Sequence, residues 1–225
     1  MSELYLVRHG QASFGAENYD KLSDKGIQQA RWLGEYFQQR EIGFSKLWRG
    51  DLLRHQETAQ GICCALPQQP QSIVQPGLNE FDFKNIAGAY LSLFPNEKPA
   101  ADSLPAEFYR LLKKAMKAWS EQRLPPELLT ESWQQFRGRV EQSREDICAA
   151  DDGEPVLVVS SGGAIGMFMS LVLGFSAQQV IELNMQIKNT GLSHFYFNQR
   201  TVRLSSFNTI PHLDVPQRFN HITFS

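Results

Sequence analysis

The stretch Leu4-Tyr5-Leu6-Val7-Arg8-His9-Gly10, near the N-terminus, decides the fold class of this chain. Its four apolar residues are typical of a buried strand, and the glycine that ends the stretch lets the backbone approach a ligand closely. In an open α/β sheet, the residues that follow a strand line the ligand crevice. We therefore expect Arg8 to hold a phosphoryl group while His9 attacks phosphorus. A strand followed by a polar turn is the alternative that these residues alone leave open.

Length and composition are those of an ordinary globular protein. The chain has 225 residues, of which 42% are hydrophobic and 20% charged, with a formal net charge of −2 and a pI of about 6.2. These values fit a single domain spanning 1–225. The near-neutral charge gives no general electrostatic reason to expect nucleic-acid binding.

Cysteine usage and the N-terminus indicate the compartment. Three cysteines, two of them the adjacent Cys63-Cys64, form no disulfide framework, and an odd count is more natural where thiols stay reduced. The N-terminus lacks the basic region and the apolar length of a signal peptide, and no stretch has transmembrane length. We expect a cytoplasmic protein that makes no membrane contact.

Apolar residues at helical spacing predict several helices, the first with Ser23 as its N-cap. A further helix is expected to begin after Ser160-Ser161-Gly162-Gly163 and to end near Gly174. The predicted apolar stripes are Ile27, Ala30, Leu33 and Phe37; Ala59, Ile62, Cys63 and Leu66; Phe108, Leu111, Leu112, Ala115 and Trp119; and Trp133, Phe136, Val140 and Ile147.

Short apolar runs alternate with these helices. They lie at 72–74 and 156–159, with two further strands predicted at 192–197 and 202–207. Alternation of strands and helices predicts an α/β three-layer sandwich, with a mostly parallel central sheet and helices on both faces. If the first strand and 156–159 are neighbours, the polar residues after each strand face one crevice.

A third polar candidate is Arg54, near the start of a helix, where backbone amides favour anions. A surface arginine near Glu57 is the alternative.

The motifs together resemble the histidine phosphatase superfamily, also called the phosphoglycerate mutase-like family. The similarity runs in order through most of the chain, and several motifs in the right order are more specific than any one of them. The matching stretches are Leu6-Val7-Arg8-His9-Gly10-Gln11; Tyr19-Asp20-x-Leu22-Ser23-x-x-Gly26-x-x-x-Ala30; Asp51-Leu52-x-Arg54-x-x-x-Thr58-Ala59; Leu78-Asn79-Glu80; Val158-Val159-Ser160-Ser161-Gly162-Gly163; and Asn189-Thr190-Gly191.

The resemblance implies a phosphomonoester hydrolase acting on a small phosphorylated substrate, with no metal or other cofactor. His9 carries a transient phosphohistidine, Arg8 and Arg54 hold the phosphoryl oxygens, and Glu80 is the acid and base. Asp82 is a less favoured acid.

Two further residues, Gln11 and Ser13, either donate to the phosphate or stabilise their own loop. The resemblance also implies a helical cap insertion at about 82–150 over the active site, where substrate choice resides. Its basic residues Arg110, Lys113, Lys114 and Lys117 either steer an anionic substrate or form a solvated face, and we favour the solvated face.

The sequence departs from the family pattern at Ser161, where the family has a second histidine that binds phosphoryl oxygens, and at Gly166, which is often arginine. Ser161 and Gly162 remain candidate phosphate-binding residues, although a serine hydroxyl is a shorter, uncharged donor. Losing one preorganised donor typically costs on the order of 10²–10³ in rate. Two compensations are conceivable: the backbone amides of Gly162 and Gly163, or an inward-facing His212.

Three functions therefore compete. A working phosphatase is favoured by the intact Arg8, His9, Arg54 and Glu80. A weak or inactive relative that binds a phosphorylated metabolite or protein is favoured by Ser161. A phosphoglycerate-type mutase ranks third, because the longer loop of the glycolytic mutases is not evident between Gln11 and Tyr19.

Overall fold

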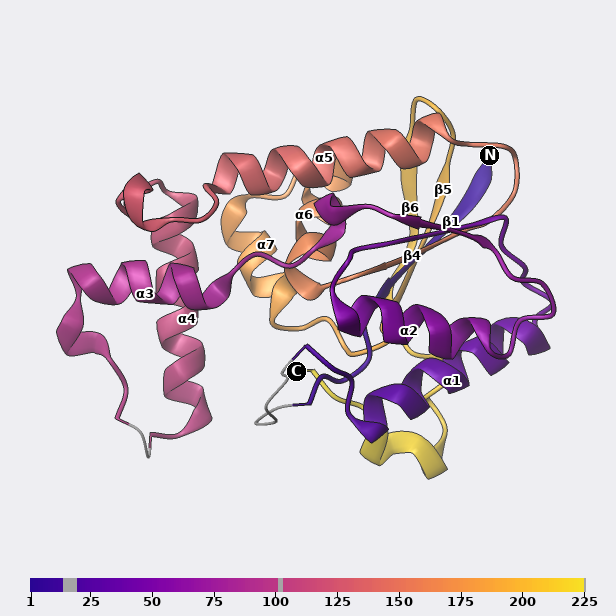
Figure 1. The fold of residues 1–225 in the computed structure, drawn as a ribbon, viewed down its shortest axis with the longest axis horizontal. Coiled ribbons are helices and arrows are strands. Elements are labelled where there is room, and N and C mark those ends of the chain that lie inside the picture. Colours follow the sequence, from indigo (N-terminus) through magenta and orange to yellow (C-terminus); the bar gives the residue numbers. More distant parts are fainter. Residues whose placement is uncertain (14–19, 101–102, 225) are drawn as a thin grey trace.

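A computed structural model describes residues 1–13, 20–100 and 103–224 (Figure 1). Within these residues, six strands form one sheet in the order β3-β2-β4-β1-β5-β6. Four of them are parallel: β1 (Ser2–Arg8), β2 (Lys46–Arg49), β3 (Gln71–Val74) and β4 (Val156–Ser160). At one edge, β5 (Leu192–Phe197) pairs antiparallel with β1, and β6 (Val202–Thr209) pairs antiparallel with β5. The predicted mostly parallel sheet is confirmed.

The central strands β1 and β4 are neighbours, which is the condition for the polar residues after each strand to face one crevice. Arg8, the last residue of β1, lies opposite Ser160, the last residue of β4. The backbone N–H of His9 then donates to the Ser160 carbonyl, with 2.9 Å between nitrogen and oxygen. Arg8-His9 and Ser160-Ser161 therefore leave the sheet side by side, at its carboxyl edge.

Helices cover both faces of the sheet, so the predicted three layers are confirmed. Successive side chains of a strand point to opposite faces. Along β1, Tyr5 and Val7 pack with α1 (Asp24–Gln39) and α2 (Leu53–Cys63). Leu4 and Leu6 belong to the core on the other face, with α5 (Trp133–Ala149), α6 (Gly162–Leu173) and α7 (Ala177–Asn184).

Between Asp82 and Ala150 the chain forms α3 (Phe83–Leu93), α4 (Pro105–Ser120) and α5. In Figure 1, α3 and α4 lie at the left, on the side of the sheet where β1 and β4 end. Short 3-10 turns occur at Pro76–Leu78, Pro95–Glu97, Pro126–Leu128 and Pro216–His221.

The sequence patterns located most helices, with three differences. Ser23 caps α1 as predicted, since its hydroxyl accepts from the Gly26 N–H at 3.1 Å, and Gly174 ends α6 in the left-handed conformation. Neither α3 nor α7 was predicted. Phe108 does not belong to a buried stripe, because 45% of its surface is exposed, whereas Ala115 and Trp119 on the same helix are buried.

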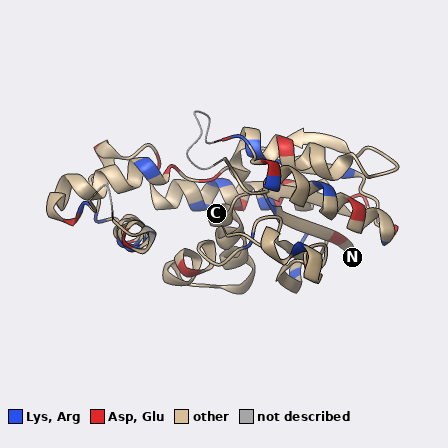
Figure 2. Cartoon of the chain, turned by 90° about the horizontal axis from the view of Figure 1, so that it is seen from below, with Lys and Arg blue, Asp and Glu red and all other residues tan. Residues whose placement is uncertain are grey.

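Charged residues of both signs are interspersed along the ribbon (Figure 2). On α4, Lys113 pairs with Glu182 at 2.6 Å, Lys114 pairs with Glu97 at 2.9 Å, and Lys117 pairs with Glu121. This favours the solvated-face interpretation of the basic residues. Among the described residues, no helix is both long enough and apolar enough to span a bilayer.

Candidate active site

His9 follows β1 and is nearly inaccessible, with 7% of its surface exposed. Its Nδ1 lies 2.7 Å from the carbonyl oxygen of Gly10. A carbonyl only accepts, so Nδ1 carries the proton and the lone pair is on Nε2. Burial, followed by the charges of Arg8 and Arg54, holds the pKa of His9 well below 6.5. The ring is therefore neutral at physiological pH.

Two arginines flank this imidazole, and both are buried. Arg8 donates from one terminal nitrogen to the carbonyls of Ile187 and Phe224, the latter at 2.5 Å. Arg54, in the first turn of α2, pairs with Asp20 at 2.6 Å. Arg54 is 8% exposed, so the interpretation of Arg54 as a surface residue is wrong.

Thr58 ties the His9 loop to α2. Its hydroxyl accepts from the Gly10 N–H at 2.9 Å and donates to the Arg54 carbonyl at 2.7 Å. Gly10 is required here, because a Cβ at this position would lie 2.5 Å from the Gly26 carbonyl oxygen. The loop after β1 therefore packs directly on the backbone of α1.

The backbone on the other side of His9 is held by the segment before β5. Thr190 donates its N–H to the Arg8 carbonyl at 3.1 Å, and the Asn189 side chain donates to the His9 carbonyl at 3.1 Å. Both residues are fully buried. Asn189 and Thr190 therefore hold the backbone of Arg8 and His9 in place.

Ser161, the residue that stands where the resemblance implies a second histidine, is fully buried at the start of α6. Its Oγ lies 2.7 Å from Nε2 of His55, which is also fully buried. The His55 and His9 rings lie 5.8 Å apart between centroids. Burial, then the charges of Arg54 and Arg49, hold the pKa of His55 well below 6.5.

Glu80 reaches the same edge of the sheet. Its Oε2 accepts from the Gly163 N–H at 3.0 Å, so this carboxylate meets the N-terminal turn of α6. Of the two conceivable compensations, the one through the Gly163 amide is disfavoured, since that amide already donates to Glu80. Gly162 lies beside Arg8, because a Cβ at Gly162 would be 3.6 Å from Arg8 Nε. Asp82 is exposed and caps α3, accepting from the Asn85 N–H at 3.0 Å.

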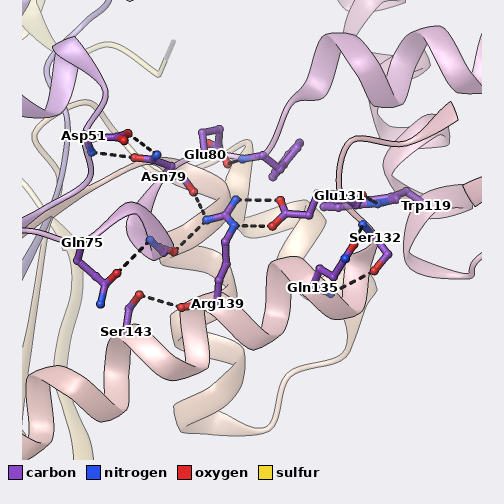
Figure 3. Close-up of polar contacts among 12 residues, drawn as sticks. Asp51, Gln75, Asn79, Glu80, Trp119, Glu131, Ser132, Gln135, Arg139 and Ser143 are labelled. Atoms are coloured by element: carbon purple, nitrogen blue, oxygen red, sulfur yellow. Dashed lines mark hydrogen bonds and ion pairs between the residues drawn. The ribbon is translucent and has the colours of Figure 1, made fainter. Parts of the chain in front are cut away.

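Arg139 of α5 holds the loop that carries Glu80 (Figure 3). One of its terminal nitrogens donates to the carbonyls of Gly77 and Asn79, at 2.9 and 2.7 Å. The rest of the guanidinium binds both carboxylate oxygens of Glu131, at 2.5 and 3.0 Å. The fixed planar fork of arginine makes this geometry specific.

Gln11 and Ser13 lie against the start of α1. Gln11 accepts from Ser23 at its backbone oxygen and at Oε1, and its N–H donates to Gln29. The Ser13 N–H donates to the Lys21 carbonyl at 2.8 Å. These contacts favour the loop-stabilising alternative for both residues. Tyr19, which belongs to one of the motifs, lies outside the described residues.

His212 does not compensate for the missing histidine. It is 3% exposed, and its Nε2 lies 2.8 Å from the Thr190 hydroxyl. Burial, with a smaller contribution from Arg218, lowers the pKa of His212 to about 3. The neutral His212 side chain thus bonds Thr190, whose backbone N–H in turn donates to the Arg8 carbonyl next to His9.

The model of the histidine phosphatase superfamily (branch 1) matches residues 4–210. The chain belongs to the histidine phosphatase superfamily. Two relatives, each named "Probable phosphoglycerate mutase GpmB", are 29% identical (Enterobacter sp. strain 638) and 28% identical (Salmonella typhi) over 227 and 228 residues. Each alignment covers 96% of this chain and 97% of the relative.

Solved histidine phosphatases share the fold. A phosphoserine phosphatase variant from Entamoeba histolytica, in complex with phosphoserine, is similar with a TM-score of 0.64 and 21% identity, over 95% of this chain and 100% of that one. The α-ribazole phosphatase from Shigella flexneri has a TM-score of 0.67 and 19% identity, and the similarity covers 92% of this chain and 96% of that one. These likenesses support the three-layer architecture and carry no substrate assignment.

Several supporting residues of this histidine phosphatase were missed by sequence reasoning. His55 and Thr58 lie within the stretch 51–59 that resembles the family, but neither was assigned a role from the sequence. Arg139 lies in a helix that was predicted only to pack against the core. A signal existed for Thr58, which follows Arg54 by one helical turn and so shares its face. None existed for the bonds from Arg139 to the carbonyls of Gly77 and Asn79, which lie 62 and 60 positions away.

Proposed function

We propose that this histidine phosphatase hydrolyses a small phosphomonoester through a phosphohistidine formed on His9. The observation that carries the proposal is the Nδ1–H bond from His9 to the Gly10 carbonyl, which leaves the lone pair on Nε2. Burial and two neighbouring arginines keep that ring uncharged. A neutral, oriented imidazole beside two fixed cations suits attack on a phosphate ester.

The reaction proceeds in two displacements. In the first, Nε2 of His9 forms a bond to phosphorus, the bond to the leaving oxygen breaks, and Glu80 gives that oxygen a proton. In the second, Glu80 takes a proton from water, whose oxygen attacks phosphorus and breaks the bond to Nε2. Inorganic phosphate leaves and both residues return to their starting states. Arg8 and Arg54 neutralise charge on the phosphoryl oxygens throughout.

Two alternatives have specific support. Replacement of the second histidine by Ser161 favours a protein that binds a phosphorylated metabolite or protein without turnover. The names of the relatives favour a mutase, which returns the phosphoryl group to a second hydroxyl instead of to water. The segment between Gln11 and Tyr19 bears on the choice between phosphatase and mutase, and residues 14–19 of it lie outside the described residues.

Phosphate release from p-nitrophenyl phosphate, phosphoserine and 3-phosphoglycerate tests the proposal, from acidic to neutral pH. We expect release that His9→Ala abolishes, while His194→Asn leaves it unchanged. His194 is a matched control, because it pairs with Glu3 near the opposite end of β1. Release that does not depend on His9 contradicts the proposal. Conversion of 3-phosphoglycerate to 2-phosphoglycerate without phosphate release identifies a mutase, and binding without either reaction identifies the inactive relative.

A further inference from the structure

The buried pair of His55 and Ser161 has no place in the reaction described above. Its two members come from different elements, the first turn of α2 and the N-cap of α6, and both are fully buried. The pair also faces the nucleophile, since the His55 ring lies 5.8 Å from that of His9. A histidine from α2 therefore approaches the position where the resemblance implies a histidine on the β4–α6 turn.

The Ser161 hydroxyl is not used to cap its own helix. Ser161 occupies the N-cap with extended backbone angles, the conformation from which serine usually caps, yet its side chain makes no cap hydrogen bond to α6. In the described part of the chain, Oγ instead bonds Nε2 of His55, at 2.7 Å. The bond is thus a tertiary contact between residues 106 positions apart.

The position of the proton on His55 decides which way the pair donates. Its lowered pKa makes the ring neutral, with a single N–H. Nδ1 is buried and has no hydrogen-bond partner among the described residues, whereas Nε2 faces Ser161. Buried N–H groups without a partner are rarer than acceptors without one, which places the proton on Nε2. Nε2–H then donates to Oγ, so the bond to His55 does not use the hydroxyl proton of Ser161.

Gly50, at the end of β2, makes room for this histidine. A Cβ at Gly50 would lie 2.2 Å from His55 Nδ1 and 2.3 Å from Asn79 Oδ1. Contacts below 3.0 Å are essentially never made by real Cβ atoms. The His55 ring therefore occupies a space that a side chain at position 50 would fill.

We propose that Ser161 and His55 together bind a phosphoryl oxygen, replacing the second histidine implied by the family resemblance. In this arrangement the Ser161 hydroxyl touches the oxygen, and His55 is a positioning residue that holds and polarises that hydroxyl. Hydrogen bonds in series strengthen one another at low dielectric, which partly offsets the loss of a cationic donor. The inference rests on the proposed function, because it places a phosphoryl group beside His9.

Matched substitutions separate the pair from general packing. His55→Gln keeps an N–H near the place of Nε2, whereas His55→Asn ends one bond short of it. Ser161→Ala removes the hydroxyl. The probes are inorganic phosphate and vanadate, whose dissociation constants are measured by calorimetry on the full chain, together with kcat/KM for p-nitrophenyl phosphate. Thermal unfolding of each variant checks that it folds.

We expect Ser161→Ala and His55→Asn each to weaken vanadate binding by at least 10-fold and to lower kcat/KM by on the order of 10²-fold. His55→Gln should retain most of the vanadate affinity and most of kcat/KM. Because His55 acts through Ser161, the double variant with Ser161→Ala and His55→Asn is no weaker than Ser161→Ala alone. His194→Asn, the control, changes neither quantity.

Three results overturn the inference: additive losses in the double variant, unchanged vanadate affinity in a folded Ser161→Ala protein, or a wild-type protein that binds neither anion. The binding measurements need no turnover, so the proposed function is tested separately. Weakened anion binding in Ser161→Ala, with no phosphate release by the wild type, would keep the pair and reject the hydrolase. Release that depends on His9 but not on Ser161 or His55 would keep the hydrolase and reject the pair.

Discussion

The carboxylate of Glu80 accepts a hydrogen bond from the backbone N–H of Gly163, with 3.0 Å between Oε2 and nitrogen. These residues come from a loop after β3 and from the first turn of α6, 83 positions apart. This bond fixes one oxygen of the Glu80 side chain, so the turn that follows β4 orients the proposed acid. The position of Glu80 therefore depends on how closely this loop approaches the backbone of α6.

Replacing Gly163 by alanine should displace Glu80. The added Cβ would lie 2.2 Å from Glu80 Oε1 and 2.4 Å from the Phe81 ring, which is itself buried. We expect kcat for p-nitrophenyl phosphate to fall by at least 10-fold and the free energy of unfolding to fall by about 1–3 kcal/mol, as in other overpacked cores. Steady-state kinetics and urea unfolding measure the two effects.

Gly138→Ala on α5 is the matched control, because nothing lies within 4 Å of a Cβ at that position. An alanine in a helix interior is favoured over glycine, so this variant should gain about 0.5–1 kcal/mol and keep its kcat. If Gly163→Ala kept full activity as well, the proposed role of Glu80 would have to be abandoned or moved to another carboxylate.

Arg139→Lys tests whether the loop that carries Glu80 must be fixed for catalysis. Lysine keeps the charge but cannot bind Glu131 with two nitrogens while donating to Gly77 and Asn79. Small misplacements of a catalytic group are costly, so we expect kcat to fall about 10-fold or more with little change in phosphate affinity. Arg137→Lys, at an exposed position of the same helix, should leave kcat unchanged. Equal effects of the two substitutions would contradict a positioning role for Arg139.

Local patterns were enough to predict every strand of the sheet except β2, and to single out His9 as the candidate nucleophile. The apolar run before Arg8, the cap at Ser23 and the stripe on α5 each reside in a few consecutive residues, so the sequence carries them directly. The helices α3 and α7 were missed. The buried residues of α3, Ile86, Ala89 and Tyr90, do fall at helical spacing, so the sequence carried a signal that was not used. In contrast, α7 has only eight residues, which is too short to show a period.

The supporting contacts of the site could not be predicted, because they join distant parts of the chain. His55 meets Ser161 across 106 positions, and Arg139 meets Gly77 across 62. The same limit applies to Gly163. The sequence places its amide at a helix start, but only the folded chain shows that this amide donates to Glu80.

The ion pairs on α4 predict that substrate capture is insensitive to the basic face. Lys113, Lys114 and Lys117 each pair with a carboxylate, so their field largely cancels at a distance. We expect kcat/KM for p-nitrophenyl phosphate to change less than two-fold in the variant that combines Lys113→Gln and Lys114→Gln. The ionic-strength dependence of kcat/KM should match that of the wild type between about 0.02 and 0.5 M salt. A shallower dependence in the variant would show that these lysines do steer the substrate.

The buried histidines predict a loss of stability in mild acid. His9, His55 and His212 all have lowered pKa values in the folded protein, that of His212 being about 3. In the unfolded chain each titrates near 6.5, so below that pH the unfolded state binds more protons than the folded state. Their stabilising contribution is complete above about pH 6.5 and is lost as the pH falls toward the folded pKa.

For His212 alone, moving from pH 7.5 to pH 5 should cost about 2 kcal/mol of unfolding free energy, at about 1.4 kcal/mol per unit below 6.5. Urea unfolding of the wild type and of His212→Asn across this range isolates the effect. The variant is expected to be less stable at pH 7.5, since it loses the bond to Thr190, but to lose about 2 kcal/mol less on acidification. Parallel pH dependences would mean that His212 already binds a proton in the folded protein at pH 5. The conclusion that His212 is neutral in its bond to Thr190 would then be wrong.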